Sequence, residues 1–573
     1  MSSMKLLSVH CDYINFKPLK KALKNPEELS EERKKEITIK DPLVIFTAVE
    51  KSDESNPDVL NRYIAEIMSL AEQVGSKNIV LYPYAHLSSS LSNPDFALKT
   101  LEGAEKELTK KKYVVSRAPF GYYKEFSLKC KGHPLSELSR EIGEVKNEKG
   151  KVITAVEEKY DPKQLLSELT KSKLDTSKLN GNDHRIIGHA MDLFSFSDIA
   201  PGMVFWHNNG WTIFNELVNF WREEHRKAGY QEIRTPQILD KKLWQISGHW
   251  EKYKENIFLS DYEKRTFAVK PMNCPGGMIV YRNSPKTYKD LPLRLAELGI
   301  VHRQELSGVL SGLFRVIQFT QDDAHIFCTE KQLEEEIIKI IELVDRFYTL
   351  FGFSYHVELS TRPEKRIGDD KLWDKAEEIL EDVLKKKKMK FKINKGDGAF
   401  YGPKIDFHIK DSLNRTWQLA TIQLDFAMPD RFDLSYVDKD NKEKRPIILH
   451  RVIYGSLERF IGILLEHTNG HLPLWLAPIQ VRIVNFTDRN NAICESLFEE
   501  LLKHNVRVDT DLKSEPLQGK IKEAELQKIP YIIVIGDKEE KSGNLAVRTK
   551  GRIEQINRDE FIEKVIKEIA EKI

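Results

Sequence analysis

Residues 293–327 read LRLAELGIVHRQELSGVLSGLFRVIQFTQDDAHIF, and this stretch decides the fold of the central part of the chain. Two strand-like runs flank a loop rich in Ser and Gly, which predicts an antiparallel hairpin with an extended tip. Side chains two residues apart on a strand share a face, so one side would carry Arg315, Phe319, Gln321, Asp323 and His325. Such a set makes a poor core but a good pocket for a nucleotide and a small polar substrate. On this stretch alone, a solvated sheet face stays open as the alternative.

The whole chain has the composition of a globular protein of several domains. Its 573 residues are 40% hydrophobic and 31% charged, and this length predicts about three or four domains. The formal charge is only +2, so any surface that binds nucleic acid must be local. We find no apolar run of membrane-spanning length and no secretory signal, and therefore expect a cytoplasmic protein with no membrane partner. Five scattered cysteines fit reduced thiols in that compartment.

Three shifts in composition divide the chain. Residues 1–143 alternate β-rich runs with a helical stretch at 57–75, which predicts a compact α/β domain. Residues 144–183 are rich in charge and poor in aromatic residues, which indicates a linker with a short amphipathic helix at 164–169. Residues 184–474 are aromatic-rich and form the candidate catalytic domain. Residues 475–573 alternate strands with helices and predict a small, mainly parallel sheet.

A lone cysteine stands in PMNCPGGMIV, residues 271–280. No second cysteine lies two to four residues from Cys274, so the local pairing of a zinc finger or a redox motif is missing. Cys274 is therefore either a small buried apolar residue or one member of a set whose partners are distant in sequence. The chain also has no G-x-x-x-x-G-K-[ST] motif, so nucleotide binding would not use a P-loop.

Several motifs, in the right order, resemble those of class II aminoacyl-tRNA synthetases. The hairpin at 293–327 is similar to motif two, LHRVIYGSLERFIGILLE (449–466) to motif three, and WTIFNELVNFWREEHRKAGYQEIRTP (211–236) to motif one. This likeness implies a catalytic domain built on an antiparallel sheet, and a homodimer. More narrowly, PMNCPGG, HRQELSG, STRPEKRIG, GAFYGPKIDF and TWQLATIQLDF together resemble threonyl-tRNA synthetases. That family attaches L-threonine to threonine tRNA through a threonyl-adenylate formed with ATP.

The resemblance implies one Zn²⁺ per chain, held by Cys274, His325 and His450. A thiolate and two imidazoles suit zinc, and three protein ligands leave a fourth position open for substrate. An apolar pocket discriminates poorly between threonine and the nearly isosteric valine, whereas a zinc ion that accepts the amino and hydroxyl groups of threonine rejects valine. Asp323 would hold the hydroxyl's proton. Cys328 has the opposite strand parity to His325, so we expect it in the core.

The same resemblance assigns the ATP site. Arg303 would contact the α-phosphate, Glu305 the adenine amino group and Phe319 the face of the base. Arg315 and Arg459 would hold the pyrophosphate end of ATP together with Mg²⁺. For Arg459, a simple ion pair with Glu458 is the alternative interpretation.

Further positions match those around the threonyl-adenylate, namely Gln321, Tyr401, Lys404 and Gln418. His249 matches a histidine that assists the ribose hydroxyl of the terminal adenosine during transfer. An exposed loop histidine is the other interpretation of His249.

A second site is expected because serine keeps both zinc-binding groups of threonine. The missing methyl group is worth only about 1–3 kcal/mol, or about 10- to 200-fold. VHCDY, YPYAHLSS, APFGYYKEF and KCKGHPLSELSR resemble the archaeal-type editing domain, which is similar to D-aminoacyl-tRNA deacylases. The matching residues are His86, Tyr123, Lys124 and Glu137, which would bind the seryl ester and the tRNA 3′ end and place a hydrolytic water.

Residues 475–573 resemble the anticodon-binding domain of several class II synthetases. Ser514, Glu539 and Arg548 match positions that read anticodon bases, which is how proteins recognise single-stranded loops. Ser514 stands where bacterial relatives commonly have Asn, and a serine hydroxyl still donates or accepts a hydrogen bond.

Three other functions stay open. A prolyl- or histidyl-tRNA synthetase would share motifs one to three without needing the Cys/His/His set, so metal content separates it. A catalytically inactive paralogue that binds RNA as a regulator is disfavoured by Arg303, Arg315, Lys404 and Arg459. A deacylase fused to a binding module would not need the ATP residues. Threonine-dependent ATP–pyrophosphate exchange distinguishes an enzyme from the last two.

Overall fold

The computed structural model describes residues 4–23, 26–88, 90–133, 135–142, 166, 179–263 and 265–572. The chain forms two compact units, Met1–Lys159 and Tyr160–Ile573. Mixed sheets and helices in both units give the α/β and α+β multidomain architecture that the sequence predicts. The helix expected at 164–169 lies, apart from residue 166, outside the described residues. The domain boundaries at 143, 183 and 474 stay predictions.

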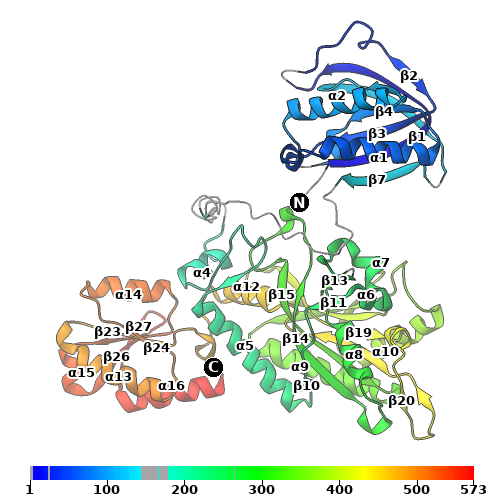
Figure 1. Ribbon diagram of the computed structural model, residues 1–573. Helices are drawn as coiled ribbons and strands as arrows, with labels where there is room; N and C mark the ends of the chain where they lie inside the picture. Colours follow the sequence, from blue (N-terminus) through cyan, green and yellow to red (C-terminus); the bar gives the residue numbers. More distant parts are fainter. Residues whose placement is uncertain are drawn as a thin grey trace. The chain divides into compact units, whose positions relative to one another are not determined.

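The first unit is built on a seven-stranded sheet (Figure 1). Strands β3, β4 and β5 are parallel, and α1 and α2 connect them. The long β1 is antiparallel to β3 and β7 over its first half and to β2 and β6 over its second. The elements are β1 (Met4–Lys21), β2 (Ile37–Lys40), β3 (Pro42–Ala48), α1 (Val59–Val74), β4 (Asn78–Pro83), α2 (Pro94–Lys110), β5 (Val114–Arg117), β6 (Tyr122–Cys130) and β7 (Glu137–Ile142).

Each face of this sheet has its own apolar cluster. Tyr63, Ile67 and Leu70 recur at helical spacing on α1 and are buried together with α2 against one face. On the other face, Phe46 and Tyr82 pack with residues of β1 and β6. The opposite face of β3 and β4 is therefore aromatic, and β6 lies against it.

The second unit contains an eight-stranded sheet in the order β10-β14-β15-β22-β19-β18-β16-β17. Neighbouring strands are antiparallel except for the pairs β10–β14 and β16–β17. The strands are β10 (Gln231–Glu232), β14 (Leu293–His302), β15 (Gln318–Cys328), β16 (Ser354–Ser360), β17 (Phe391–Asn394), β18 (Lys404–Lys410), β19 (Thr416–Asp425) and β22 (Ile447–Val452). The predicted hairpin is confirmed as β14–β15, but Arg315 precedes β15 and lies in the connecting loop.

The two faces of this sheet differ in polarity. On β15, Ala324, Ile326 and Cys328 belong to the main apolar core, so the expectation that Cys328 is a core residue is confirmed. The alternate residues, including Asp323 and His325, face the other side, as the period of two requires. The helices that pack in the apolar core include α5 (Asn208–Lys227), α9 (Leu333–Leu350), α10 (Asp370–Lys386) and α12 (Leu457–Thr468). The polar face is thus left for a site.

Shorter elements surround this sheet. The helices are α4 (His184–Ala190), α6 (Lys241–Ser247), α7 (His249–Tyr253), α8 (Cys274–Arg282) and α11 (Met428–Arg431). A three-stranded sheet has the order β11 (Ile238–Asp240), β13 (Arg265–Val269), β12 (Leu259–Tyr262). Two-stranded ribbons are formed by β8 (Phe194–Ser195) with β9 (Phe205–Trp206) and by β20 (Tyr436–Val437) with β21 (Glu443–Lys444).

The C-terminal sheet is mixed, whereas the sequence predicted a mainly parallel one. β24, β23 and β25 are parallel, but β26 and β27 continue the sheet antiparallel. A parallel crossover needs about a dozen residues, and the segment between β25 and β26 is shorter than that. The elements are β23 (Val481–Asn485), α13 (Asn491–Lys503), β24 (Val508–Asp511), α14 (Leu517–Leu526), β25 (Tyr531–Ile535), α15 (Asp537–Ser542), β26 (Asn544–Thr549), β27 (Arg552–Asn557) and α16 (Arg558–Glu571).

In the part of the chain that the structure describes, no helix is both long enough and apolar enough for a membrane span.

Separate cores predict separate responses to core mutations. Ile67 is fully buried in the first unit, so Ile67→Ala should cost about 2–5 kcal/mol of the stability of that unit. Hydrogen exchange should then show faster exchange in α1 and α2 and unchanged protection of α9. The matched variant Ile340→Ala, in α9, should instead speed exchange in α9 and leave the protection of α1 and α2 unchanged. Equal loss of protection in both units after either substitution would contradict separate cores.

Candidate functional site

Three arginines gather at the hairpin between β14 and β15. Arg303 donates from Nε to the carbonyl of Pro271, and its guanidinium lies 5.1 Å from the ring centroid of Phe319. Arg315 pairs with Glu305 at 2.8 Å, which joins the two arms of the loop. Burial, followed by the positive charges of Arg315 and Arg303, lowers the pKa of Arg459. The three cations are therefore close enough to repel one another, as expected of a site for a polyanion.

Arg459 does not form the ion pair with Glu458 that was the alternative interpretation of the sequence. Its Nε donates to the carbonyl of Phe314 at 2.8 Å. The carboxylate of Glu458 instead accepts from the backbone N–H of Thr320 at 2.9 Å. Arg459 is thus anchored to the hairpin loop.

A second polar group lies on β18 and β19. Lys404 Nζ lies 2.8 Å from Asp406 and 2.9 Å from Asp397. Burial lowers the pKa of Lys404, but the two carboxylates outweigh it, so the net shift is upward and the ammonium is charged. Gln418 donates to the other oxygen of Asp406 at 2.6 Å. The structure therefore brings Lys404 and Gln418 together through a carboxylate that holds both.

Tyr401 and Gln321 lie nearby on the same polar side. The Tyr401 hydroxyl donates to Gln423, and its ring lies 5.3 Å from that of His450. Gln321 is half-buried on β15, opposite Gly299 of β14. Both residues therefore lie on the polar side of the sheet that also carries His325 and His450.

Cys274, His325 and His450 converge, although they come from three distant segments. The register of β15 and β22 places His325 directly opposite His450, with ring centroids 4.9 Å apart. Cys274 begins α8, which packs on the same side. One ligand atom from each residue lies within 4.8 Å of the others, and all three residues are buried. The question raised by the lone cysteine is thus answered by long-range pairing.

The glycines of PMNCPGG allow this approach. A Cβ on Gly277 would lie 3.3 Å from Nδ1 of His325, and one on Gly276 would lie 2.8 Å from the Thr235 side chain. Larger residues would push α8 away from β15. Asn273, directly before Cys274, donates to Asp323 at 3.3 Å and so ties the start of α8 to the same strand.

The chemistry of this trio fits a metal ion. Among the described residues, the buried Nε2 of His325 has no hydrogen-bond partner, and a metal would satisfy it. His450 Nε2 lies 2.9 Å from Asp425, an arrangement that fixes the imidazole and leaves Nδ1 as a ligand atom. Burial raises the pKa of the Cys274 thiol well above its usual range, with further increases from Asp323 and Asp425. Coordination to a metal ion would favour the thiolate instead.

His249 is buried, so the interpretation as an exposed loop histidine is wrong. It begins α7, and its Nε2 lies 3.8 Å from Cys274 Sγ. Its Nδ1 is 2.8 Å from the Ser247 hydroxyl. Burial, followed by the charges of His450 and Arg303, lowers the pKa of His249 to about 3. The imidazole is neutral at physiological pH.

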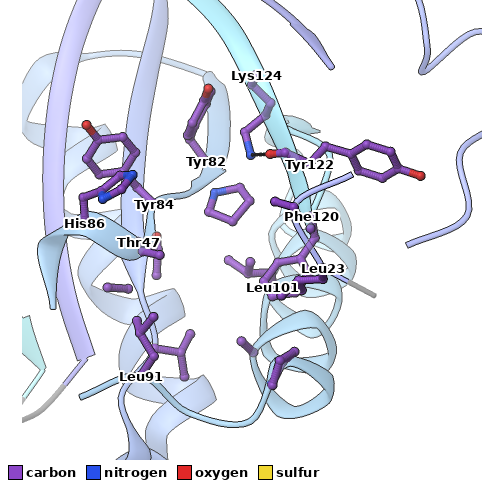
Figure 2. Close-up of a pocket in the computed structure, with 18 of the residues that line it drawn as sticks. Leu23, Thr47, Tyr82, Tyr84, His86, Leu91, Leu101, Phe120, Tyr122 and Lys124 are labelled. Carbon is purple, nitrogen blue, oxygen red and sulfur yellow. Dashed lines mark hydrogen bonds between the residues drawn. The ribbon is translucent and has the colours of Figure 1, made fainter. Parts of the chain in front are cut away.

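The first unit has a cavity of about 490 Å³ between the carboxyl ends of β3 and β4 and the strand β6 (Figure 2). Its walls include the Tyr82 ring, His86, Tyr123 and Lys124. Lys124 Nζ donates to the carbonyls of Pro119 and Tyr122 and lies 5.0 Å from the Tyr82 ring centroid. Burial lowers the pKa of Lys124 to about 8. The cavity thus contains a cation that loses its proton near pH 8.

Glu137 does not join these residues. It lies on β7, exposed and opposite Val9 of β1, and it is not among the residues that line the cavity. Strand β7 pairs with the first half of β1, whereas β6, which carries Tyr123 and Lys124, pairs with the second half. The structure therefore groups His86, Tyr123 and Lys124 and leaves Glu137 apart.

The three candidate anticodon contacts lie on the C-terminal sheet. Ser514 follows β24 and Glu539 follows β25, so both lie at the carboxyl ends of parallel strands. Glu539 also accepts from the backbone N–H of Gly536 at 3.1 Å. Arg548 lies on β26 opposite Ile532, near the start of β25. The structure brings Ser514 and Glu539 to one edge and places Arg548 further along the sheet.

Three family models match three successive segments of the chain. Residues 4–142 match the archaea-specific editing domain of threonyl-tRNA synthetase. Residues 253–468 match the class II tRNA synthetase core domain (G, H, P, S and T), and residues 480–568 match an anticodon-binding domain.

Curated relatives identify the family more closely. A threonine–tRNA ligase of Caldanaerobacter subterraneus subsp. tengcongensis is 55% identical over 392 residues, which are 68% of this chain and 61% of that protein. One from Carboxydothermus hydrogenoformans is 51% identical over 428 residues, 74% of this chain and 67% of that protein. The chain belongs to the threonyl-tRNA synthetase family. It spans about six tenths to two thirds of the length of these two relatives.

Solved structures of this family have the same fold. The RNA-binding domain of threonyl-tRNA synthetase from Cryptosporidium parvum superimposes with a TM-score of 0.65 at 40% identity and covers 67% of this chain and 97% of its own. The structure described as the putative threonyl-tRNA synthetase ThrRS-1 from Aeropyrum pernix gives a TM-score of 0.60 at 29% identity, and the match covers 68% of this chain and 97% of that one. The fold of these threonyl-tRNA synthetase structures therefore extends over about two thirds of this chain.

Several residues of this candidate site were missed from the sequence. Asp406 joins Lys404 to Gln418, and its position two residues after Lys404 on a strand was a usable signal. Asp425 contacts His450 only because β19 and β22 pair, and no local pattern announces that register. Asn273 reaches Asp323 across two elements.

The pKa of Lys124 is directly measurable. Burial disfavours the ammonium, so Lys124 should be charged below about pH 8 and neutral above it. Carbon-13 NMR of lysine-labelled protein should show a side-chain resonance that titrates near pH 8. Lys124→Met should remove that resonance. Its persistence in the variant, or the lack of any lysine resonance titrating between pH 7 and 9, would contradict the burial of this ammonium.

Proposed function

We propose that this chain is an ATP-dependent threonine–tRNA ligase that also hydrolyses mischarged seryl-tRNA. Residues 184–474 would catalyse charging, residues 475–573 bind the anticodon and residues 1–143 edit, with 144–183 as the linker. The observation that carries the proposal is the convergence of Cys274, His325 and His450 beside an arginine-rich hairpin. A synthetase for proline or histidine has no need of that trio. Membership of the threonyl-tRNA synthetase family supports the same conclusion.

Activation of threonine requires the charged groups around the hairpin. Arg303, Arg315 and Arg459 would bind the phosphates of ATP and stabilise the charge that develops as the threonine carboxylate attacks the α-phosphate, with Mg²⁺ as counter-ion. Phe319, whose ring lies against the Arg303 guanidinium, would stack on adenine. Glu305 would accept a hydrogen bond from the amino group of the adenine. Glu305 now pairs with Arg315, so ATP would exchange that ion pair for contacts to base and phosphate.

The amino-acid pocket would lie between the trio and β18. Cys274, His325 and His450 would hold one Zn²⁺, which supplies a Lewis-acidic centre for the amino and hydroxyl groups of threonine. Asp323 would accept a hydrogen bond from the hydroxyl, and valine would lose this contact because its methyl group cannot donate one. Lys404, Gln418, Gln321 and Tyr401 would line the adenylate. His249, neutral and buried beside Cys274, would assist the ribose hydroxyl during transfer.

Editing would take place in the cavity of the first unit. The aromatic walls and the apolar lining suit the 3′ adenine, and the Lys124 ammonium would stabilise the negative charge of the ester during hydrolysis. His86 and Tyr123 lie at the exposed margin and would contact the RNA. The role assigned to Glu137 stays a prediction, because Glu137 lies on β7 and not among the residues that line the cavity.

The remaining partners follow from the same assignment. Threonine tRNA would be read at Ser514, Glu539 and Arg548. The segment 211–236, which contains most of α5 and all of β10, supports a homodimer through its likeness to motif one. All five cysteines are free thiols, which supports a cytoplasmic protein.

Zinc content tests the proposal. Purified protein should contain one zinc per chain, and Cys274→Ser should lose the metal together with threonine-dependent ATP–pyrophosphate exchange, because oxygen is a poorer zinc ligand than thiolate. Cys328→Ala, three residues beyond His325 on the apolar face, should keep both. Elemental analysis measures the first quantity and isotope exchange the second. Retention of metal and exchange in Cys274→Ser would refute the ligand assignment.

Proofreading can be tested separately. Lys124→Met should leave the rate of threonine charging unchanged while seryl-tRNA accumulates in the presence of serine. Deletion of residues 1–143 should have the same effect. Hydrolysis by the unaltered protein, after subtraction of spontaneous hydrolysis, should decline as pH rises through about 8, since the ammonium is then lost. Unchanged clearance of seryl-tRNA after either alteration would mean that proofreading resides elsewhere.

A further inference from the structure

The tip of the hairpin loop is a tight turn, Ser311–Arg315, which is held by two side chains from outside the loop. The backbone N–H of Leu313 donates to Nε2 of His184 at 3.0 Å. The carbonyl of Phe314 accepts from Nε of Arg459 at 2.8 Å. Inside the turn, Phe314 N–H donates to Ser311 at 2.9 Å. Because Arg315 is the next residue, these anchors fix the backbone position from which its side chain extends.

His184 is itself held rigidly. Its side chain is fully buried, and its Nδ1 lies 2.7 Å from Oε1 of Glu466. Since Nε2 accepts the Leu313 N–H, the ring proton must be on Nδ1 and is donated to Glu466. Arg415 donates to the other oxygen of Glu466 at 2.6 Å. Burial acts to raise the pKa of Glu466, but the hydrogen bonds from His184 and Arg415 lower it overall, so the carboxylate is charged.

One helix fixes the turn at two points. Arg459 lies near the start of α12 and Glu466 near its end, so the helix contacts the turn directly through Arg459 and indirectly through His184. The packing is close. Gly312 has a φ of +49°, and a Cβ at this position would lie 2.2 Å from His184 Nε2. The Phe314 ring lies 4.2 Å from the His184 ring.

A metal ion is not the occupant of this cluster. Asp183, His184 and Glu466 are close enough to share a cation. However, Arg185 forms a bidentate pair with Asp183, Arg415 pairs with Glu466, and both nitrogens of His184 are used. The cluster is a hydrogen-bonded support.

We propose that His184 is a positioning residue for ATP. Oriented by Glu466 and Arg415, it holds the Leu313 N–H and thereby places Arg315 toward the pyrophosphate end of the nucleotide. This inference rests on the proposed ATP-dependent ligase function. It assigns His184 to the affinity for ATP and not to the binding of threonine or zinc, since its contacts lie at the hairpin tip and on α12.

Two substitutions separate the two hydrogen bonds of the ring. The amide of Gln reaches the position of Nε2, so His184→Gln keeps an acceptor for Leu313. The shorter His184→Asn keeps only the contact with Glu466. We expect His184→Asn to raise the KM for ATP about threefold to tenfold in ATP–pyrophosphate exchange, the effect of one lost hydrogen bond. His184→Gln should stay within about twofold, and KM for threonine and zinc content should not change in either.

The control is His467→Asn, the same substitution one residue beyond Glu466. His467 Nδ1 accepts from the backbone N–H of Ser412 and not from the hairpin. Hydrogen exchange at the Leu313 amide gives a readout independent of activity and should accelerate in His184→Asn only. An unchanged KM for ATP and unchanged Leu313 exchange in His184→Asn, or equal losses in both His184 variants with a lowered Tm, would overturn the proposal. Failure of the unaltered protein to exchange would overturn the ligase function instead.

Discussion

The register between β15 and β22 is the constraint on which the catalytic region depends. It places His325 opposite His450 on one face and, on the other, sets Ala324 and Leu449 into the core beneath the helices. A shift of one residue in either strand would turn the imidazole of that strand into the core and bring its apolar side chains to the polar face. Cys274 can join them because α8 begins beside β15, where Gly277 leaves room for the His325 ring.

The two faces of the eight-stranded sheet have different roles, because one packs in the core and the other carries the candidate site. Its apolar face is buried under α5, α9, α10 and α12, while its polar face carries paired charges such as Lys404 with Asp406. Helix α12 belongs to both, since it fills the core and holds the hairpin tip through its two ends. Burial thus stabilises the sheet and also fixes the groups that would bind ATP.

Two selection steps would be located in two separate units. The trio on the eight-stranded sheet suits the distinction between a hydroxyl and a methyl group, which is a matter of coordination. The cavity beside Lys124 in the first unit suits hydrolysis of an ester that the first step accepts. Each unit has its own apolar core, so neither site needs the other in order to form.

The sequence predicted the hairpin, its polar face and the α/β class, because these depend on local periodicity. The resemblance supplied the trio, which no spacing rule would have found, since Cys274 and His450 meet only through long-range pairing. The burial of His249 and the separation of Glu137 from the cavity beside Lys124 were missed, because exposure depends on which elements pack together. The antiparallel end of the C-terminal sheet was missed because the alternation of strands and helices does not reveal strand direction, which the short connection between β25 and β26 determines.

Zinc-edge X-ray absorption on the purified protein would show whether Cys274, His325 and His450 hold zinc. We expect a first shell with one sulfur and two imidazole nitrogens from the chain, which gains nitrogen and oxygen neighbours when L-threonine is added and changes differently with L-valine. A shell without sulfur, or one that is indifferent to L-threonine, would contradict this expectation.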